Sequence, residues 1–294
     1  MALTASGQLS LGDIATEMGV SLSNVSLTTQ STTDINTNSE SKPDGSTPHA
    51  VSEFYSYDHS AASSYTTDGL LLDFDAGDVN SYPGTGTSVY SLYGNHTGSM
   101  DNGLTYTATS GGYFEMDGVD NRLSVPHSSD LKISTGSIEV WYNITSRGIM
   151  VHTSINTDNR FDLIGGFFTG AYPDESLGTV GRRAGTTGRI EAYRNGETWL
   201  NSQGWVQHVY TLDGTTSKYY INGSEITLTK SPGPGSDYFL NCAAASGDIV
   251  FGDRNTFTNL AVNGKFSIGR IYGKALSSSE VTANFNYAKD RYGL

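Results

Sequence analysis

From about Leu70 onward, apolar and polar residues alternate with a period of two, which is the pattern of half-buried β-strands. The strands are short, and Asp-Gly or Asn-Gly pairs of the kind found in tight hairpins follow them. The clearest strand segments are Gly112–Asp117, Gly136–Ile144, Trp205–Leu212 and Ser217–Ile221. This arrangement predicts an all-β sandwich. Near the end, residues 275–289 change to a helical pattern, with Ser277 or Ser278 as the N-cap.

The first 60 residues follow a different pattern. They contain seven acidic residues and one basic residue, Lys42, and residues 30–46 hold a single aliphatic side chain, Ile35. Such a stretch buries too little apolar surface to fold alone. The sequence therefore predicts an N-terminal arm or linker over residues 1–60 and a β-sandwich domain over residues 61–294.

Two short apolar segments interrupt the polar arm. The first begins at Ser10, where the spacing to Asp13 matches a helix-capping pattern. Side chains three and four residues apart lie on one face of a helix, so each segment presents an apolar stripe. The stripes consist of Leu11, Ile14 and Met18 in the first segment and Val51, Phe54 and Tyr55 in the second. We expect these segments to be anchor helices that dock on another molecule.

Charge and composition narrow the class of partner. The net charge of −13 repels phosphate backbones, so we expect no nucleic-acid partner. Residues 13–26 resemble a helix-turn-helix, but residues 1–41 contain no Lys or Arg to contact phosphates. We also expect no membrane insertion and no signal peptide, because the sequence has neither an 18-residue apolar stretch nor a basic segment followed by an apolar one at its start.

Several segments together resemble one known family. The residues that carry the resemblance are LDFDAGDVNSYPGTGT at 72–87, LYGN at 92–95, GYFEMDGVDNRL at 112–123, SIEVWY at 137–142, GWVQHVYTLDG at 204–214 and YYING at 219–223. In this order they look like a concanavalin A-like lectin/glucanase domain of the laminin-G-like type. The resemblance implies a concanavalin A-like jelly-roll β-sandwich, here with a partly helical N-terminal arm and a C-terminal helix. It implies little about activity, because this fold hosts many functions.

A second resemblance concerns the two ends of the chain. The segments SLGDIATE at 10–17, VSEFY at 51–55 and NFNYAKDRYGL at 284–294 look like parts of virion structural proteins of tailed phages. This resemblance implies a virion protein made in the host cytoplasm: a fibre, a tail-associated adhesin or a capsid decoration. Its implied partners are other virion proteins through the arm, host-surface glycans through the lectin-like domain, and further copies of the chain in a homo-oligomer. A decoration that binds no sugar is the alternative.

The best candidate for sugar binding is the segment 165–200. Glycans are held by aromatic faces and planar polar groups, and this segment concentrates both. The candidate residues are Phe168, Tyr172, Arg182, Arg183, Arg189, Tyr193, Arg194 and Trp199. The alternative is that the aromatic residues belong to the core and that the arginines pair with nearby acids.

Two acidic clusters suggest further chemistry. Asp73, Asp75 and Asp78 could supply oxygen ligands to Ca²⁺, which is the one cofactor the sequence suggests. Glu115 and Asp117 have the spacing of the paired acids in glucanases of this fold, which would indicate a glycan hydrolase. The Asp117-Gly118 pair, however, favours a hairpin turn at this point. We therefore expect no catalytic residues, and a protein that binds or assembles rather than an enzyme.

Overall fold

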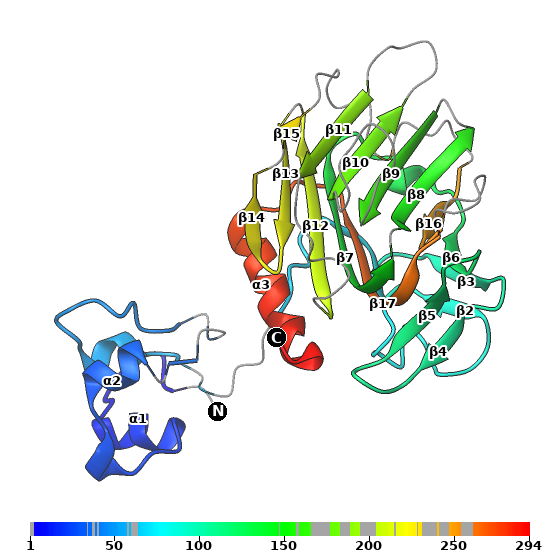
Figure 1. The fold of residues 1–294 in the computed structure, drawn as a ribbon. Coiled ribbons are helices and arrows are strands. Elements are labelled where there is room, and N and C mark those ends of the chain that lie inside the picture. The colour runs from blue at the N-terminus through cyan, green and yellow to red at the C-terminus, as the bar shows by residue number, and fades with distance from the viewer. Residues whose placement is uncertain are drawn as a thin grey trace. The chain divides into compact units, whose positions relative to one another are not determined.

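The computed structural model of the 294-residue chain divides into two compact units, Met1–Ser64 and Tyr65–Leu294 (Figure 1). The structure describes residues 3–33, 35–36, 39, 41–57, 59, 64–146, 148–156, 159–165, 177–182, 189–194, 204–214, 216–227, 229–230, 240, 247–253 and 261–294. Within these ranges no helix has the length and hydropathy that crossing a bilayer requires.

The N-terminal unit contains four short helical segments. They are α1 (Leu11–Glu17), the 3₁₀ turn η1 (Leu22–Asn24), α2 (Leu27–Thr32) and the 3₁₀ turn η2 (Val51–Phe54). The helix α1 begins as predicted, because the Ser10 side chain accepts a hydrogen bond from the Asp13 backbone N–H and the Asp13 side chain accepts one from the Ser10 backbone.

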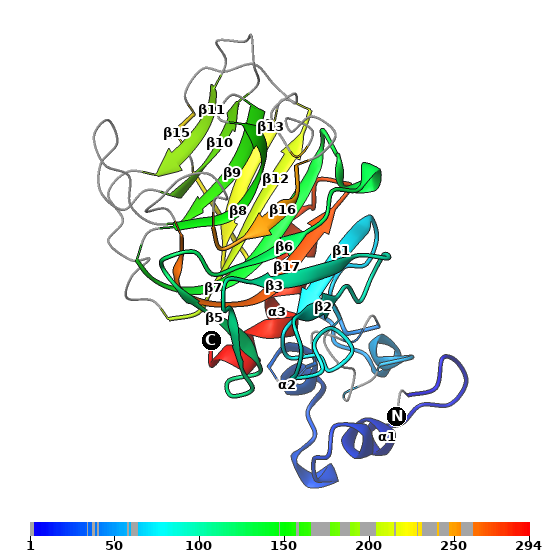
Figure 2. The same cartoon turned by 90° about the vertical axis from the view of Figure 1, so that its right-hand side faces the viewer.

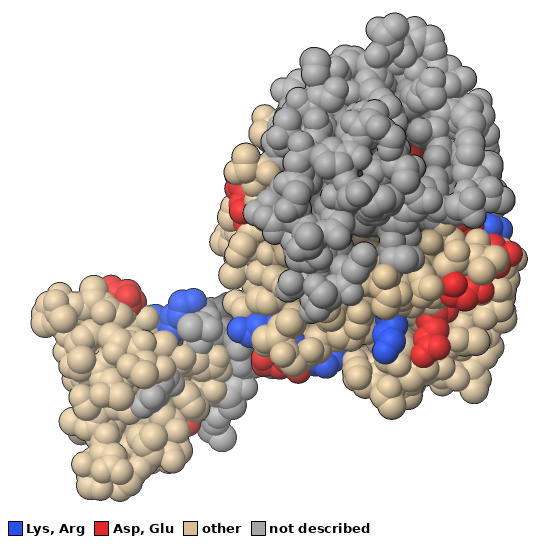
Figure 3. All heavy atoms as spheres, in the orientation of Figure 1, with Lys and Arg blue, Asp and Glu red and all other residues tan. Residues whose placement is uncertain are grey.

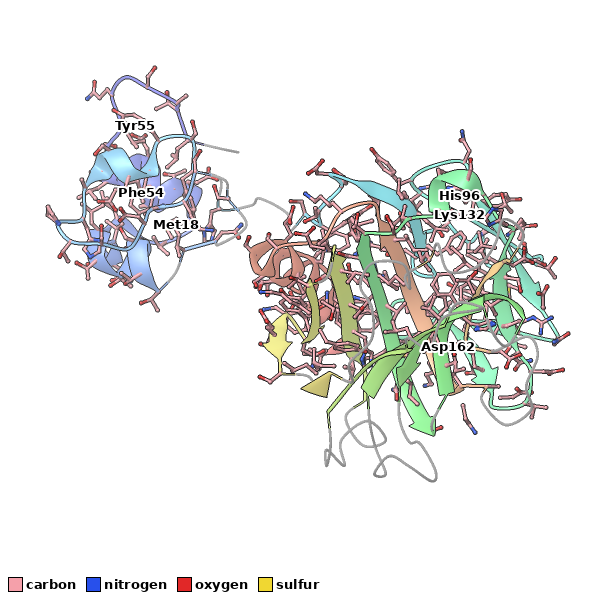
Figure 4. All side chains as sticks on the ribbon, turned by 90° about the horizontal axis from the view of Figure 1, so that it is seen from above. Met18, Phe54, Tyr55, His96, Lys132 and Asp162 are labelled. Atoms are coloured by element: carbon pink, nitrogen blue, oxygen red, sulfur yellow. The ribbon has the colours of Figure 1, made fainter. Side chains whose placement is uncertain are left out.

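These segments form a small hydrophobic core of their own. Ile14, Met18, Phe54 and Tyr57 are buried, with Leu3, Leu9, Val20, Val25, Leu27, Ile35 and Val51 partly buried around them. Figure 4 shows Met18, which follows α1, and Phe54, which ends η2, inside this unit. Residues 30–46, which we expect not to fold alone, contribute Ile35 to this cluster. Apolar residues spread between positions 3 and 57 combine into one cluster, which a local reading of residues 30–46 misses.

The anchor prediction changes for the same reason. Ile14, Met18 and Phe54 pack against one another and are not available to another molecule in this state. The Tyr55 hydroxyl donates to the Gly7 carbonyl oxygen at 2.6 Å, and Val51 is half-buried. Of the six predicted anchor residues, Leu11 is exposed, at 40%. Leu22 on η1, which was not among the six, is exposed at 62%.

The second unit is an antiparallel β-sandwich, which confirms the predicted fold class. One sheet has eight described strands, in the order β14 (Ser224–Ile226), β13 (Thr216–Ile221), β12 (Val206–Asp213), β7 (Gly136–Ser146), β17 (Asn263–Tyr272), β5 (Tyr113–Asp117) and β4 (Thr105–Thr107), with β1 (Leu70–Asp75) paired to β17 beside β5. We call it sheet A.

The other sheet, sheet B, has nine described strands. Their order is β15 (Thr229–Lys230), β11 (Arg189–Arg194), β10 (Leu177–Arg182), β9 (Asn159–Gly165), β8 (Gly148–Asn156), β16 (Ile249–Phe251), β6 (Arg122–Val125), β3 (Thr97–Asp101) and β2 (Ser88–Tyr90). Figure 2 shows β6, β3 and β2 side by side at one end of this sheet. The turn η3 (Ser129–Leu131) follows β6.

The main core lies between the two sheets. Phe74, Phe114, Phe251 and Phe266 are fully buried there, and Phe251 stacks on Phe266 with ring centroids 5.2 Å apart. The helix α3 (Ser278–Ala288), capped by Ser277 as predicted, and the turn η5 (Lys289–Tyr292) end the chain. Val281 and Leu276 pack on Val209, Tyr220 and Tyr272, so α3 covers the outer face of sheet A over β12, β13 and β17.

Candidate functional site

A buried polar network lies on the outer face of sheet A and connects it to α3. Arg270, fully buried on β17, donates from Nε to Asp73 Oδ1 at 2.9 Å, and its Nη1 lies 3.6 Å from Glu139 Oε1. Burial raises the pKa of Asp73 above its usual range, and the Arg270 charge offsets part of that rise. Because buried charges need partners, these groups have a structural role.

Glu139 joins this network to the C-terminal helix. Its Oε1 accepts hydrogen bonds from Trp141 Nε1 at 3.0 Å and Gln207 Nε2 at 2.9 Å. Its Oε2 accepts one from Asn284 Nδ2 at 2.6 Å, and Asn284 lies on α3. The carboxylate therefore links β7, β12 and α3, and no part of it faces solvent.

The predicted calcium ligands Asp73, Asp75 and Asp78 also make contacts within the protein. Asp73 is paired with Arg270, and the buried carboxylate of Asp75 accepts two hydrogen bonds from Arg291, at 2.6 and 2.9 Å. Asp78 Oδ1 accepts from the backbone and side-chain nitrogens of Asn80. The described residues contain no group of three or more potential metal ligands. Asp73 and Asp75 are thus paired with guanidinium groups 197 and 216 residues away in sequence, and calcium binding by the three aspartates stays a prediction.

The glucanase-like acids lie at the far edge of sheet A. Asp117 Oδ1 accepts from the backbone N–H of Val119 at 2.8 Å and of Asp120 at 3.4 Å, which fixes the turn after β5. Glu115 is exposed, and its Oε1 accepts from the Thr107 hydroxyl at 3.3 Å. The Asp117 carboxylate thus has the turn-forming role that the Asp-Gly pair predicts.

The outer face of sheet B carries a row of directly opposed residues. In register they are Ser88, Ser99, Ser124, Val250, His152, Asp162, Val180 and Glu191, one from each of eight neighbouring strands. Their sequence neighbours Val89, Met100, Leu123, Phe251 and Leu163 are in the core. Successive strand residues point to opposite faces, so the described side chains of the row, from Ser88 to Asp162, face away from the core.

The row is buried at its centre. His152 Nδ1 lies 2.5 Å from Asp162 Oδ1, and both side chains are 2% exposed. Val250 is 2% exposed. Asp162 is labelled in Figure 4. Sequence reasoning missed this pair, because His152 and Asp162 become neighbours only through the pairing of β8 with β9.

Toward β2 the same face opens to solvent. We define the β2–β6 patch by Tyr90, Thr97, Ser99, Asp101, Arg122 and Ser124, which are exposed or half-buried. Tyr90 is 48% exposed. Figure 3 shows acidic side chains gathered at the lower right of the jelly roll, where Figure 1 places β2 to β6.

The patch has a fixed polar centre at Asp101. Its Oδ1 accepts from the Ser99 hydroxyl at 2.9 Å, and its Oδ2 accepts from the Ser124 hydroxyl at 2.6 Å and from Arg122 Nε at 3.5 Å. Arg122 Nη1 also reaches Asp253 Oδ2 at 3.5 Å. The carboxylate is 29% exposed, so it is both held in place and accessible.

Four of the predicted sugar-binding residues lie on strands β10 and β11 of sheet B. Arg182 pairs with Arg189, Tyr193 with Gly178, and Arg194 with Leu177 in the β10–β11 register. The structure describes the backbone of these strands. Phe168, Tyr172, Arg183 and Trp199 lie outside the described residues. The patch at the opposite end of sheet B was not among the candidates, since its six residues are spread from Tyr90 to Ser124 and form no recognisable motif.

Comparisons with solved structures show the same fold. Domain 4 of AbnA, an extracellular arabinanase of Geobacillus stearothermophilus solved with arabinotriose, is 18% identical, with a TM-score of 0.50 over 72% of this chain and 96% of that one. A mutant of HCR/D is 14% identical, with a TM-score of 0.52 over 74% of this chain and 52% of that one.

The sequence itself matches a family as well. No curated protein matches the chain. Residues 117–282, more than half of the chain, match the family described as the concanavalin A-like lectin/glucanases superfamily. Together with the two-sheet sandwich, this match shows that the chain belongs to the concanavalin A-like lectin/glucanases superfamily.

Proposed function

We propose that this protein is a virion structural protein of a tailed phage whose jelly roll binds glycans on the host surface. In this proposal the unit Met1–Ser64 attaches the chain to other virion proteins, and the jelly roll carries the recognition face. Fibre, tail-associated adhesin and capsid decoration are all compatible with this division. The membership in a lectin and glucanase family supports the glycan-binding half, and the resemblance at the two ends of the chain supports the virion half.

One observation carries the proposal for the jelly roll. Of the two outer sheet faces, that of sheet A is covered by α3 over β1, β17, β12 and β13 and is exposed at β5, whereas that of sheet B has the open β2–β6 patch. The patch combines an exposed aromatic ring with a held carboxylate and a guanidinium, which are the groups that recognise sugar rings and hydroxyls. The arabinotriose bound to domain 4 of AbnA shows that a domain of this fold can hold a neutral oligosaccharide.

We propose that the protein binds without catalysing. A hydrolase of this fold would need two carboxyl groups close together and free to act on the glycosidic bond. Asp117, the better placed of the two candidates, accepts hydrogen bonds from the backbone of its own turn.

One measurement tests the glycan-binding part of the proposal, and another tests the virion part. A glycan array probed with the full chain should give saturable binding that free glycan competes. Cryo-EM of the intact particle should place residues 1–64 against another virion protein. A blank array with the chain present in the particle would leave a decoration without sugar binding. A chain absent from the particle would remove the virion role.

A further inference from the structure

We propose that the β2–β6 patch binds an internal stretch of a neutral oligosaccharide and excludes a terminal anionic sugar. This inference rests on the proposed glycan-binding function and adds the class of ligand. It is carried by three features of the patch: an exposed aromatic ring on a fixed backbone, a held carboxylate acceptor, and a cation whose charge is already compensated.

The aromatic ring is Tyr90 on the edge strand β2. It is 48% exposed although its backbone is fixed on both sides. The Tyr90 N–H donates to the Ser81 carbonyl oxygen at 2.8 Å, and Tyr90 is paired with Thr97 of β3. Because the backbone of Tyr90 is held before binding, only its side-chain rotamers lose conformational entropy when an apolar sugar face stacks on the ring.

The acceptor is Asp101 on β3. Two hydroxyls and one guanidinium hold its two oxygens, and a carboxylate offers about four lone-pair sites. Oδ1 accepts one bond from Ser99, which leaves capacity for a sugar hydroxyl. Tyr90 and Asp101 thus offer a stacking surface and a hydrogen-bond acceptor on the same open face.

The charge balance of the patch disfavours anions. Arg122 is the only Lys or Arg among the described side chains of this face, and it lies 3.5 Å from both Asp101 Oδ2 and Asp253 Oδ2. Two carboxylates and one guanidinium give a formal charge of −1. An anionic sugar would have to compete with two fixed carboxylates for this cation and would meet their repulsion.

The dimensions favour more than one sugar unit. Tyr90 on β2 pairs with Thr97 of β3, and Asp101 lies four residues further along β3. Four residues of a strand span about 13 Å at the usual rise per residue. This is longer than one pyranose ring, so a chain of sugars can contact Tyr90 and Asp101 together.

The test uses the full chain and two sets of probes. The first set is neutral cello-, malto-, galacto- and arabino-oligosaccharides of one to six units, and the second is lactose against 3′- and 6′-sialyllactose. Calorimetry should show an affinity that rises at least tenfold from one unit to the best longer chain in one neutral series. Sialylation should give no gain over lactose.

Variants then assign the binding to the patch. Tyr90→Ala and Asp101→Asn should each weaken binding of the best neutral probe at least tenfold, and Tyr90→Phe should keep it. Tyr93→Ala is the matched control, because Tyr93 is equally exposed, at 47%, but lies beyond Tyr90 on the side away from Asp101. Circular dichroism confirms that each variant is folded.

The outcomes separate the inference from the proposed function. Preference for sialyllactose, full binding by single sugars, or neutral binding that survives both Tyr90→Ala and Asp101→Asn overturns the inference and leaves a glycan-binding protein. Binding to none of these probes and to no glycan on the array overturns both.

Discussion

The two outer faces of the sandwich use the same kinds of residue for opposite purposes. On sheet A, Asp73, Arg270 and Glu139 lie fully buried beneath α3, where they hold the helix and β1 in place. On sheet B, Asp101 and Arg122 have a similar acid–guanidinium contact, but 29% and 19% of their side chains remain exposed. Residue type alone therefore does not identify a recognition site in this fold; what decides is whether another element covers the residue.

The largest expected effect comes from breaking the buried network. Arg270→Met leaves Asp73 and Glu139 buried without their cation, which should lower the free energy of unfolding by about 3–5 kcal/mol. Urea unfolding followed by tryptophan fluorescence measures it. Lys218→Ala, which removes the exposed Lys218–Glu225 pair, is the control and should cause no measurable change. Equal effects of the two substitutions would show that the network is not structural.

A smaller loss should follow from removing the tail contact. Arg291 reaches Asp75 through two hydrogen bonds and is 23% exposed, while the Asp75 carboxylate is 3% exposed. Arg291→Ala should therefore destabilise the jelly roll by about 2–3 kcal/mol, since it leaves a buried carboxylate without its partner. Calorimetric melting would show it, and glycan affinity per folded molecule should not change. A weaker affinity would connect the tail to the recognition face.

A histidine in the core between the two sheets should make the free energy of unfolding depend on pH. His208 is buried in the core beside the Tyr219 hydroxyl, 3.1 Å away, and burial lowers its pKa from 6.5 to about 3. The unfolded chain then binds a proton that the folded chain does not, so stability should fall as the pH drops from about 6.5 toward 3. The slope from this residue is up to about 1.4 kcal/mol per pH unit.

Comparison with His208→Phe isolates that contribution. Urea unfolding of both proteins at several pH values should show a shallower acid slope in the variant. Parallel slopes would mean that the imidazole becomes protonated within the folded protein.

The smallest effect concerns the N-terminal unit. Ser10→Ala removes the N-cap of α1 and should destabilise that unit by about 1 kcal/mol. Amide hydrogen exchange would show faster exchange in residues 11–17. Exchange in the jelly roll should stay unchanged, because each unit has its own hydrophobic core. Faster exchange in β1 or α3 would show that the two units do not fold independently.

The sequence predicts the fold well because its signals are local. Alternation in segments such as Gly136–Ile144, and the Ser277–Glu280 spacing of the C-terminal helix, each depend on a few neighbouring residues. The contacts of individual side chains depend on distant partners instead. The spacing of Asp73 and Asp75 suggests a metal site, and it gives no sign of Arg270 and Arg291, which the fold places beside them.

The recognition face was hard to predict for the same reason. Tyr90, Asp101 and Ser124 come from three strands, and only the pairing of β2, β3 and β6 brings them together. The sequence directed attention to the arginine-rich segment 165–200, where residue type was the strongest signal. Alternation within β3 places Ser99 and Asp101 on one face, and this is the one local signal that could have pointed to the patch.

Amide hydrogen exchange of the full chain, with and without the best neutral oligosaccharide, tests the central claim most directly. We predict slower exchange in residues 88–101 and 122–125 when the oligosaccharide is bound, and no change in α3 or in residues 136–146 of β7. Protection confined to α3 and β7, with none at β2, β3 and β6, would contradict the assignment of recognition to the open face of sheet B.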